Sequence, residues 1–415
     1  MAERYDAAVI GAGAAGMMAA AVAGQRGLRV VLIDHAKRLA EKIRISGGGR
    51  CNFTNRQVGP ENFLSQNPDF CRAALAAYTP QDFLALMARH RIAWHEKHRG
   101  QLFCDHSSED IITMLRTECE RGGVTWRMPC TVSEVTHNAG GGYRLETDQG
   151  MLLADQVVLA TGGMAIPQLG ASDFSLRVAR QFGLKVIEPR PALVPLTFDA
   201  DAWRPFTVLS GVALEAMVRS VTDQAAGNGR RRAHPVFHED LLFTHRGLSG
   251  PAILQASSYW APGTPLSIDL APGQGLAERW PAAKQGGRRQ LTTLLADSLP
   301  RRLAEHWLTA MPDLPADFGA RRLADIPDRQ LRSLAEGLHD WRLWPTGTAG
   351  YKKAEVMRGG VDTRGLQQKT LEARQVPGLH VIGEAVDVTG WLGGYNFQWA
   401  WASGVACGQA LIRHG

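Results

Sequence analysis

Cysteine is scarce in this chain of 415 residues, which contains only six. No two of them form a CxxC pair, and a chain of this length can build a hydrophobic core without disulfide bonds. No apolar run reaches the roughly 18 residues that a membrane-spanning helix needs. We therefore expect a cytoplasmic protein with free thiols and no membrane segment.

A strong charge of one sign is also lacking. The chain has 46 basic and 40 acidic residues, which gives a net charge of +6, and no segment forms a basic tail. This balance permits a polyanionic partner such as a nucleic acid but does not require one. Taken singly, the short basic clusters are more typical of solvated surface charge. They lie at Arg230–Arg232, Arg288–Arg289, Arg301–Arg302, Arg321–Arg322 and Lys352–Lys353.

Glycine, by contrast, is abundant, with 45 residues. An apolar strand pattern at Ala7–Ile10 leads into a Gly-x-Gly-x-x-Gly turn at Gly11–Gly16, and a helix of small apolar residues follows. A second buried strand is predicted at Val30–Ile33. Strand, turn, helix and strand in this order predict a Rossmann βαβ unit.

Each glycine of this turn has a separate task in a dinucleotide-binding unit. Gly11 permits a sharp turn, Gly13 leaves room for a pyrophosphate, and Gly16 lets the helix pack on the sheet. The helix start then offers free N–H groups to the phosphates. Asp34 ends the second strand, where a carboxylate can accept hydrogen bonds from the adenosine ribose.

Two later signatures distinguish FAD from NAD. Thr161-Gly162-Gly163 follows a buried strand, and Gly383-Glu384 follows another near the end of the chain. Both are typical of two-dinucleotide-binding flavoproteins, so we predict FAD. A helix over residues 394–400 would direct its positive end toward the flavin. No second Gly-x-Gly-x-x-Gly is present, so a nicotinamide cofactor is expected to bind only transiently.

The fold class that we predict is α/β. Three prolines between residues 189 and 195 mark a change in pattern, and strand-and-glycine signatures return toward the C-terminus. We predict a Rossmann-type FAD-binding domain, of the two-dinucleotide-binding flavoprotein type, formed by residues 1–190 and 346–415. Residues 191–345 are predicted to form an inserted mixed β/α domain that contacts the substrate.

Three longer motifs resemble the bacterial BaiN/RdsA family of FAD flavoproteins over nearly the whole chain. They are Ser46–Asn55, Leu242–Pro251 and Gly390–Ala400. Within the family, further stretches are most similar to the RdsA branch, which makes dihydrouridine in ribosomal RNA. These stretches are Leu64–Pro68, Ile92–Lys97, Gly100–Asp105 and Tyr395–Trp401. The resemblance implies FAD, NADH as reductant, and reduction of a uridine in large-subunit 23S rRNA.

The motifs and the resemblance together predict the residues that contact FAD. They are Gly11, Gly13, Ala14, Ala15, Gly16, Asp34, Lys42, Gly48, Gly49, Arg50, Cys51, Asn52, Val132, Thr161, Gly162, Gly163, Gly383, Glu384, Asn396, Phe397 and Gln398.

Cys104 is the first candidate for a catalytic residue. Most family members have Phe-Pro where this chain has Phe103-Cys104, and such a departure points to a different substrate. Reduction of the uracil 5,6 bond needs a hydride at C6 and a proton at C5, and a thiol is a workable acid for that proton. The alternative is that Cys104 is a small buried apolar residue. His245 and Tyr395 are the next candidates, although His245 could instead cap the turn that follows it.

Two other functional classes stay open at this stage. The first is a small-molecule flavoenzyme, either an aminoketone or amine oxidase or an enone reductase, and the second is a flavin redox sensor. His95 and His98 form an HxxH pair, but no ligand cluster at metal spacing completes it, so no metal site is predicted.

Overall fold

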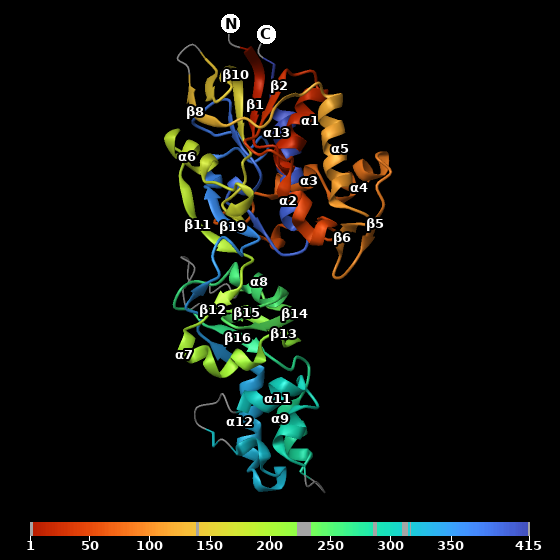
Figure 1. Ribbon diagram of the computed structural model, residues 1–415, viewed down its shortest axis with the longest axis vertical. Coiled ribbons are helices and arrows are strands. Elements are labelled where there is room, and N and C mark those ends of the chain that lie inside the picture. The colour runs from red at the N-terminus through yellow and green to blue at the C-terminus, as the bar shows by residue number, and fades with distance from the viewer. Residues whose placement is uncertain are drawn as a thin grey trace. The chain divides into compact units, whose positions relative to one another are not determined.

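The computed structural model describes residues 3–137, 141–221, 234–284, 289–308, 314–315 and 317–413. It divides into two compact units (Figure 1). Unit 1 is formed by residues 1–190 and 356–415, and unit 2 by residues 191–355. Residues 346–355 therefore belong to unit 2 and not to the returning segment. The reason is that β18 (Gly347–Thr348) pairs with β12 (Leu196–Thr197) inside unit 2.

The main sheet of unit 1 is the predicted Rossmann sheet. Its strands lie in the order β7-β2-β1-β10-β9-β8, and β20 pairs with β10. The central strand β1 runs parallel to both β2 and β10, which places their carboxyl ends at one edge. The buried strand that precedes Thr161 is the long strand β10, over Gly150–Leu159. The bounds are β1 Glu3–Ile10, β2 Val30–Ile33, β7 Thr125–Arg127, β8 Val132–His137, β9 Tyr143–Thr147, β10 Gly150–Leu159 and β20 Leu379–Val381.

Helix α1 (Ala14–Gln25) packs tightly against the C-terminal helix α13 (Tyr395–Ala410), so that the two ends of the chain meet in unit 1 (Figure 1). Gly404 and Gly408 make this approach possible, since a Cβ on either would lie 2.7 Å from a backbone oxygen of α1. Helix α5 (Ser108–Arg121) also packs on α1.

The remaining elements of unit 1 are short. A three-stranded sheet has the order β3-β6-β5, and two strand pairs are formed by β4 with β21 and by β11 with β19. Two helices, Arg72–Ala77 and Pro80–Arg89, are separated by Tyr78 and Thr79, and the Thr79 side chain caps the second helix. The bounds are α2 Glu41–Ile45, α3 Arg72–Ala77, α4 Pro80–Arg89, α6 Phe174–Gln181, β3 Asn52–Asn55, β4 Phe63–Leu64, β5 Trp94–Glu96, β6 Gln101–Cys104, β11 Val186–Ala192, β19 Val356–Val361 and β21 Thr389–Gly390.

Unit 2 is a mixed β/α structure. Its sheet has the order β17-β16-β13-β14-β15-β12-β18. The helices Leu291–Leu295 and Arg301–Trp307 are separated by a segment that ends at Pro300, and the helix Asp328–His339 is followed by the strand Trp341–Leu343. The bounds are β13 Ala213–Ser220, β14 Phe237–Thr244, β15 Gly247–Ser249, β16 Leu266–Asp269, β17 Trp341–Leu343, α7 Ala200–Trp203, α8 Pro251–Ser257, α9 Leu276–Ala282, α10 Leu291–Leu295, α11 Arg301–Trp307 and α12 Asp328–His339. In the described part of the chain, no helix has the length and apolarity needed to cross a bilayer.

Candidate cofactor and active site

The glycine-rich turn between β1 and α1 has two glycines that packing requires and one that it does not. A Cβ on Gly11 would lie 2.4 Å from the carbonyl oxygen of Ala160, and a Cβ on Gly16 would lie 1.8 Å from that of Gly11. A Cβ on Gly13 would meet nothing within 4 Å. Gly11 and Gly16 therefore shape the turn, whereas Gly13 leaves space open in front of the helix.

The N-terminus of α1 has the features of an anion site. Its N-cap is Gly13, which offers no side-chain cap, and the first turn has no acidic residue. Ala14 and Ala15 follow, so no large side chain covers the first N–H groups. Free N–H groups and the positive end of the helix dipole are the groups that bind a phosphate. The turn therefore fits the pyrophosphate of a dinucleotide.

Asp34 follows β2 beside this turn. One carboxylate oxygen accepts a hydrogen bond from the Ala12 N–H (2.7 Å), and the other accepts one from the Ala36 N–H (2.8 Å). These bonds fix the carboxylate, and its side chain keeps 17% exposure. A carboxylate has about four lone-pair sites, so two remain for ribose hydroxyls.

The Glu384 carboxylate lies where three segments of the chain meet. Its Oε2 atom lies 2.6 Å from the Lys42 ammonium of α2, and its Oε1 atom accepts from the Met357 N–H at 2.8 Å. A Cβ on Gly163 would lie 2.7 Å from this carboxylate. The signatures that are far apart in the sequence thus meet at one place. Met357 was not predicted, because a backbone donor leaves no trace in the side-chain pattern.

Two hydroxyl groups that the sequence analysis did not predict also support the site. The Thr161 hydroxyl shares a hydrogen bond of 2.6 Å with Ser175 Oγ. The Gly383 N–H donates to Ser403 Oγ of α13 at 3.1 Å. Both serines lie on helices, where no motif marks them.

A second glycine-rich turn precedes β3. Gly47, Gly48 and Gly49 have φ angles of 57°, 66° and 84°, and Cys51 has one of 48°. A Cβ on Gly48 or Gly49 would meet nothing within 4 Å. This turn is therefore defined by left-handed backbone, with open space above it. The Arg50 side chain that follows is exposed, so it is accessible to a phosphate.

Cys104 lies beside this second turn. Its N–H donates to the Arg50 carbonyl at 2.9 Å, and its strand β6 pairs with β3. The side chain is fully buried, and burial raises the pKa of the Cys104 thiol to about 12, with smaller contributions from Asp110 and Asp105. The thiol is therefore protonated and closed to solvent. Its position agrees with the catalytic interpretation, and its burial agrees with the packing one.

The other five cysteines are also buried. Cys51 begins the approach to β3, and complete burial raises the pKa of its thiol. Val132, at the start of β8, is buried as well.

Side chains at the start of α13 make protein contacts. The Asn396 amide donates to the Gly390 carbonyl (2.9 Å) and accepts from the Gly390 N–H (2.8 Å). The fully buried Gln398 accepts from the Thr54 hydroxyl (2.7 Å) and donates to the Tyr78 carbonyl (2.9 Å). These two amides, which we predicted as cofactor contacts, hold α13 to the preceding loop and to β3.

Neighbouring side chains complete this attachment. The Asn52 amide accepts from the Gly394 N–H and donates to the Leu102 carbonyl, both at 3.2 Å. Phe397 stacks on Trp401, with ring centroids 5.6 Å apart. Tyr395 is buried and makes an edge contact with Phe63.

His245 lies at the exposed tip between β14 and β15 of unit 2. The cap of this turn is supplied by Thr244, whose hydroxyl donates to the Gly247 carbonyl at 2.9 Å. His95 and His98 contact different partners. The His95 ring binds the Asp105 carboxylate at 2.7 Å, and His98 accepts from Arg99. Within the described ranges, no group of three metal-ligating side chains gathers.

Unit 1 is a Rossmann-type α/β structure with a glycine turn before α1 and a carboxylate after β2. Segments that are far apart in the chain meet at Glu384. Residues 5–410 match the model of the HI0933-like protein Rossmann domain family, and the chain belongs to that family. The predicted fold class is thereby confirmed.

Curated relatives cover nearly the whole chain and confirm the predicted resemblance. The ribosomal RNA dihydrouridine synthase of Escherichia coli (strain K12) is 49% identical over 411 residues, which cover 99% of this chain and 98% of that protein. The protein of the same name from Haemophilus influenzae is 41% identical over 418 residues and the full length of both chains. A 3-dehydro-bile acid delta(4,6)-reductase from Clostridium scindens is 29% identical over 98% of each chain.

Proposed function

We propose that this protein is an FAD-dependent reductase that converts a uridine of 23S ribosomal RNA to 5,6-dihydrouridine, with NADH as the reductant. The observation that carries the proposal is the 49% identity, over nearly the full length of both chains, to a ribosomal RNA dihydrouridine synthase. We also propose a cytoplasmic location, which an rRNA substrate supports.

The residues of unit 1 support FAD as the cofactor. Gly13 and the uncapped start of α1 would hold the pyrophosphate, and the fixed carboxylate of Asp34 would accept from the adenosine ribose. FMN has neither group, so it would leave both parts unused. When bound, FAD would supply the hydride that uracil C6 requires.

We propose that Cys104 donates the proton to uracil C5. The thiol carries its proton at neutral pH, so the proton is present when the substrate binds, and the same burial that raises its pKa makes it a weaker acid than an exposed thiol. Since the side chain is buried, RNA binding has to bring uracil into contact with it or to open its surroundings. Tyr395 and His245 are the candidates to test next.

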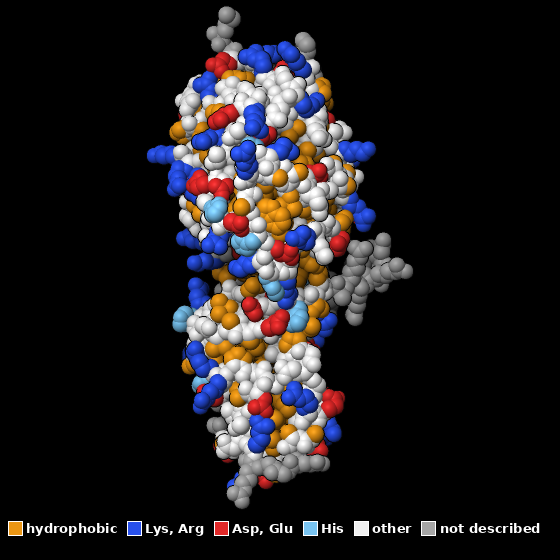
Figure 2. Space-filling view, turned by 90° about the vertical axis from the view of Figure 1, so that its right-hand side faces the viewer, with side chains coloured by type: hydrophobic (Ala, Val, Ile, Leu, Met, Phe, Trp, Pro, Cys, Tyr) orange, Lys and Arg blue, Asp and Glu red, His pale blue; other side chains and the backbone are white. Residues whose placement is uncertain are grey.

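Charge supports an RNA partner only moderately. Figure 2 shows Lys and Arg side chains spread over the face that it draws, with acidic side chains between them. Arg301 is paired with Glu305, and Arg321 with Asp317. Arg230–Arg232 and Arg288 lie outside the described residues. We therefore expect a small number of phosphate contacts, each of which adds about −0.7 to the slope of log affinity against log salt.

The experiment that tests this proposal is mass spectrometry of rRNA from a deletion strain. Loss of dihydrouridine from 23S rRNA, restored by a plasmid copy of the gene, is the expected result. In vitro, the purified protein should release FAD on denaturation and form dihydrouridine in a uridine-containing rRNA fragment with NADH. Unchanged dihydrouridine in the deletion strain would contradict the proposal.

A small-molecule enone reductase is the second candidate, favoured by the 29% identity to the bile acid reductase. The two activities share one reaction type, because uracil and a 3-oxo-Δ4,6 steroid both have a carbon–carbon double bond conjugated to a carbonyl. Faster flavin reoxidation by a steroid dienone than by the rRNA fragment would favour this second function.

A further inference from the structure

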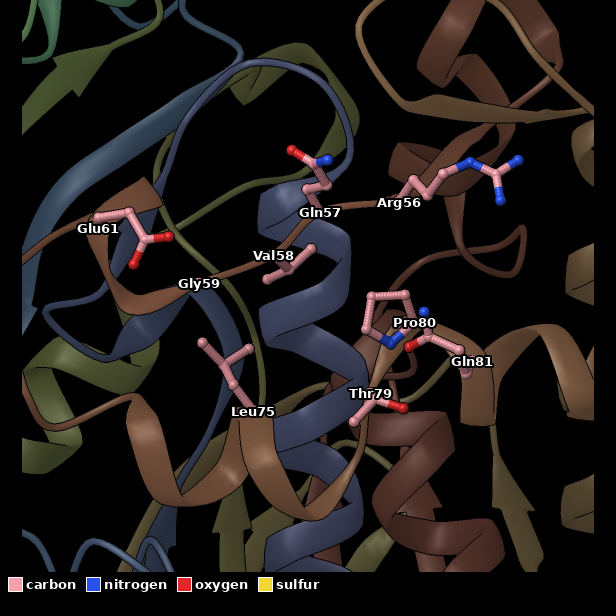
Figure 3. A pocket seen from close by; sticks show the side chains of 9 residues that line it. All are labelled: Arg56, Gln57, Val58, Gly59, Glu61, Leu75, Thr79, Pro80 and Gln81. Carbon is pink, nitrogen blue, oxygen red and sulfur yellow. The ribbon is translucent and has the colours of Figure 1, made fainter.

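A pocket of about 350 Å³ lies in unit 1, apart from all the residues predicted to contact the cofactor. One wall is formed by residues 56–61, which follow β3, and the other by residues 75–81 at the junction of α3 and α4 (Figure 3). The volume lies at the lower end of the range of small-molecule sites and is sufficient for one nucleoside.

The first wall of this pocket is attached to the segment that leads into α13. The Asn55 amide donates to the Gly393 carbonyl at 3.1 Å, and the Trp391 N–H donates to the Asn62 carbonyl at 3.0 Å. Asn52, a predicted flavin contact, lies at the other end of β3, about 13 Å from Arg56 at the usual rise of a strand. A molecule in the pocket would therefore lie near the proposed flavin site without occupying it.

Three polar side chains of the pocket are available to a ligand. The amides of Gln57 and Gln81 and the carboxylate of Glu61 are exposed, and none of them bonds to another side chain or backbone group within the described residues. Leu75 and Val58 supply apolar surface. The pocket therefore offers hydrogen-bond donors and acceptors next to a small apolar surface.

The charges of the pocket discriminate between parts of a nucleotide. The negative charge of Glu61 would repel a phosphate group inside the pocket. Arg56 stands at the rim, where it pairs with Glu96 at 2.6 Å, and its side chain points away from the other labelled residues in Figure 3. The base would therefore enter, and its phosphate would stay outside near Arg56.

We propose that this pocket binds a guanine base that flanks the target uridine in the rRNA. This inference rests on the proposed function. Guanine has two adjacent donors, N1–H and the N2 amino group, that a single carboxylate such as Glu61 can accept together. The amides of Gln57 and Gln81 carry donors for the guanine O6 atom. Uracil has only one ring N–H group on that edge, so the pocket is not the site of the reacting base.

The test is equilibrium binding of a fluorescent single-stranded rRNA fragment to the FAD-loaded full-length protein. Glu61→Gln is expected to weaken binding about tenfold. Replacing guanosine by inosine, which lacks the N2 amino group, should weaken wild-type binding by a similar factor and leave binding to Glu61→Gln unchanged. Gln81→Ala should also weaken binding, and Glu134→Gln, which changes an exposed glutamate on β8, serves as the matched control.

Two results would overturn the pocket assignment. The first is additive losses from inosine and Glu61→Gln, because additivity means that the carboxylate does not contact guanine. The second is a raised KM for NADH in Glu61→Gln with unchanged RNA affinity, which would assign the pocket to the adenine of NADH. The binding assay needs no turnover, so a wild-type protein that shows the coupling but makes no dihydrouridine contradicts only the proposed reaction.

Discussion

The two glycine-rich turns of unit 1 use glycine for different reasons. In the turn at 11–16, Gly11 and Gly16 are required because a Cβ would collide with backbone, and Gly13 stays free. In the turn at 46–50, three successive glycines have positive φ angles, and space above two of them is open. Steric packing is thus decisive at Gly16 of the first turn, and backbone conformation is decisive at Gly48 and Gly49 of the second. The first should tolerate no enlargement at Gly16, whereas the second should tolerate moderate strain.

The largest effect is expected for Gly16→Val. A Cβ there would lie 1.8 Å from the Gly11 carbonyl oxygen, so β1 and α1 could not keep their connection. We expect a loss of more than about 4 kcal/mol in the free energy of unfolding, measured by urea denaturation of the apoprotein. Gly13→Ala, at the N-cap position of the same turn, is the control and should lose no more than about 1 kcal/mol. Equal midpoints for wild type and Gly16→Val would refute the steric account.

Gly13→Val should weaken FAD binding with little effect on the stability of the fold. The branched side chain would fill the space of the pyrophosphate but touch little of the protein. The apoprotein should lose no more than about 1 kcal/mol, whereas FAD affinity should fall by at least about 100-fold. Titration of apoprotein with FAD checks this. Retention of FAD at the wild-type level would mean that the pyrophosphate binds elsewhere.

Cys104→Ala tests whether the thiol beside the second turn donates a proton to the substrate. Loss of a positioned acid slows a reaction about 10²- to 10⁴-fold, and uridine reduction should slow by such a factor. NADH oxidation with an artificial acceptor and FAD content should not change. Cys104→Ser should recover little, since a hydroxyl is a much weaker acid than a thiol. Wild-type rates of dihydrouridine formation in single-turnover assays would show that the thiol only packs.

The smallest effect is expected for Gly48→Ala. Its Cβ has room, but the φ angle of 66° strains any L-residue by about 1–2 kcal/mol. We expect a decrease of that size in the free energy of unfolding. Gly48→Asn should lose less, because asparagine tolerates the left-handed region. A loss as large as that of Gly16→Val would remove the difference between the two turns.

The parts of the fold that the sequence predicted are those set by local contacts. Gly16 touches the backbone of Gly11, five residues away in the chain, so this spacing is visible in the motif. The contacts of Gln398 were not predicted, since its partner Thr54 lies 344 residues away and no pattern links the two. Residues 346–355 were assigned to the wrong unit for a similar reason, because β18 finds its partner β12 far back in the chain.

The pairing of β11 with β19 has a consequence for how the inserted unit can change in evolution. The chain leaves unit 1 along one of these strands and returns along the other, and the Asp362 N–H still donates to the Lys185 carbonyl at 2.8 Å. An insertion whose two ends are neighbours can be gained, enlarged or exchanged without breaking any other connection of its host. Unit 2 can therefore be replaced or enlarged as a block while the Rossmann unit keeps its own topology.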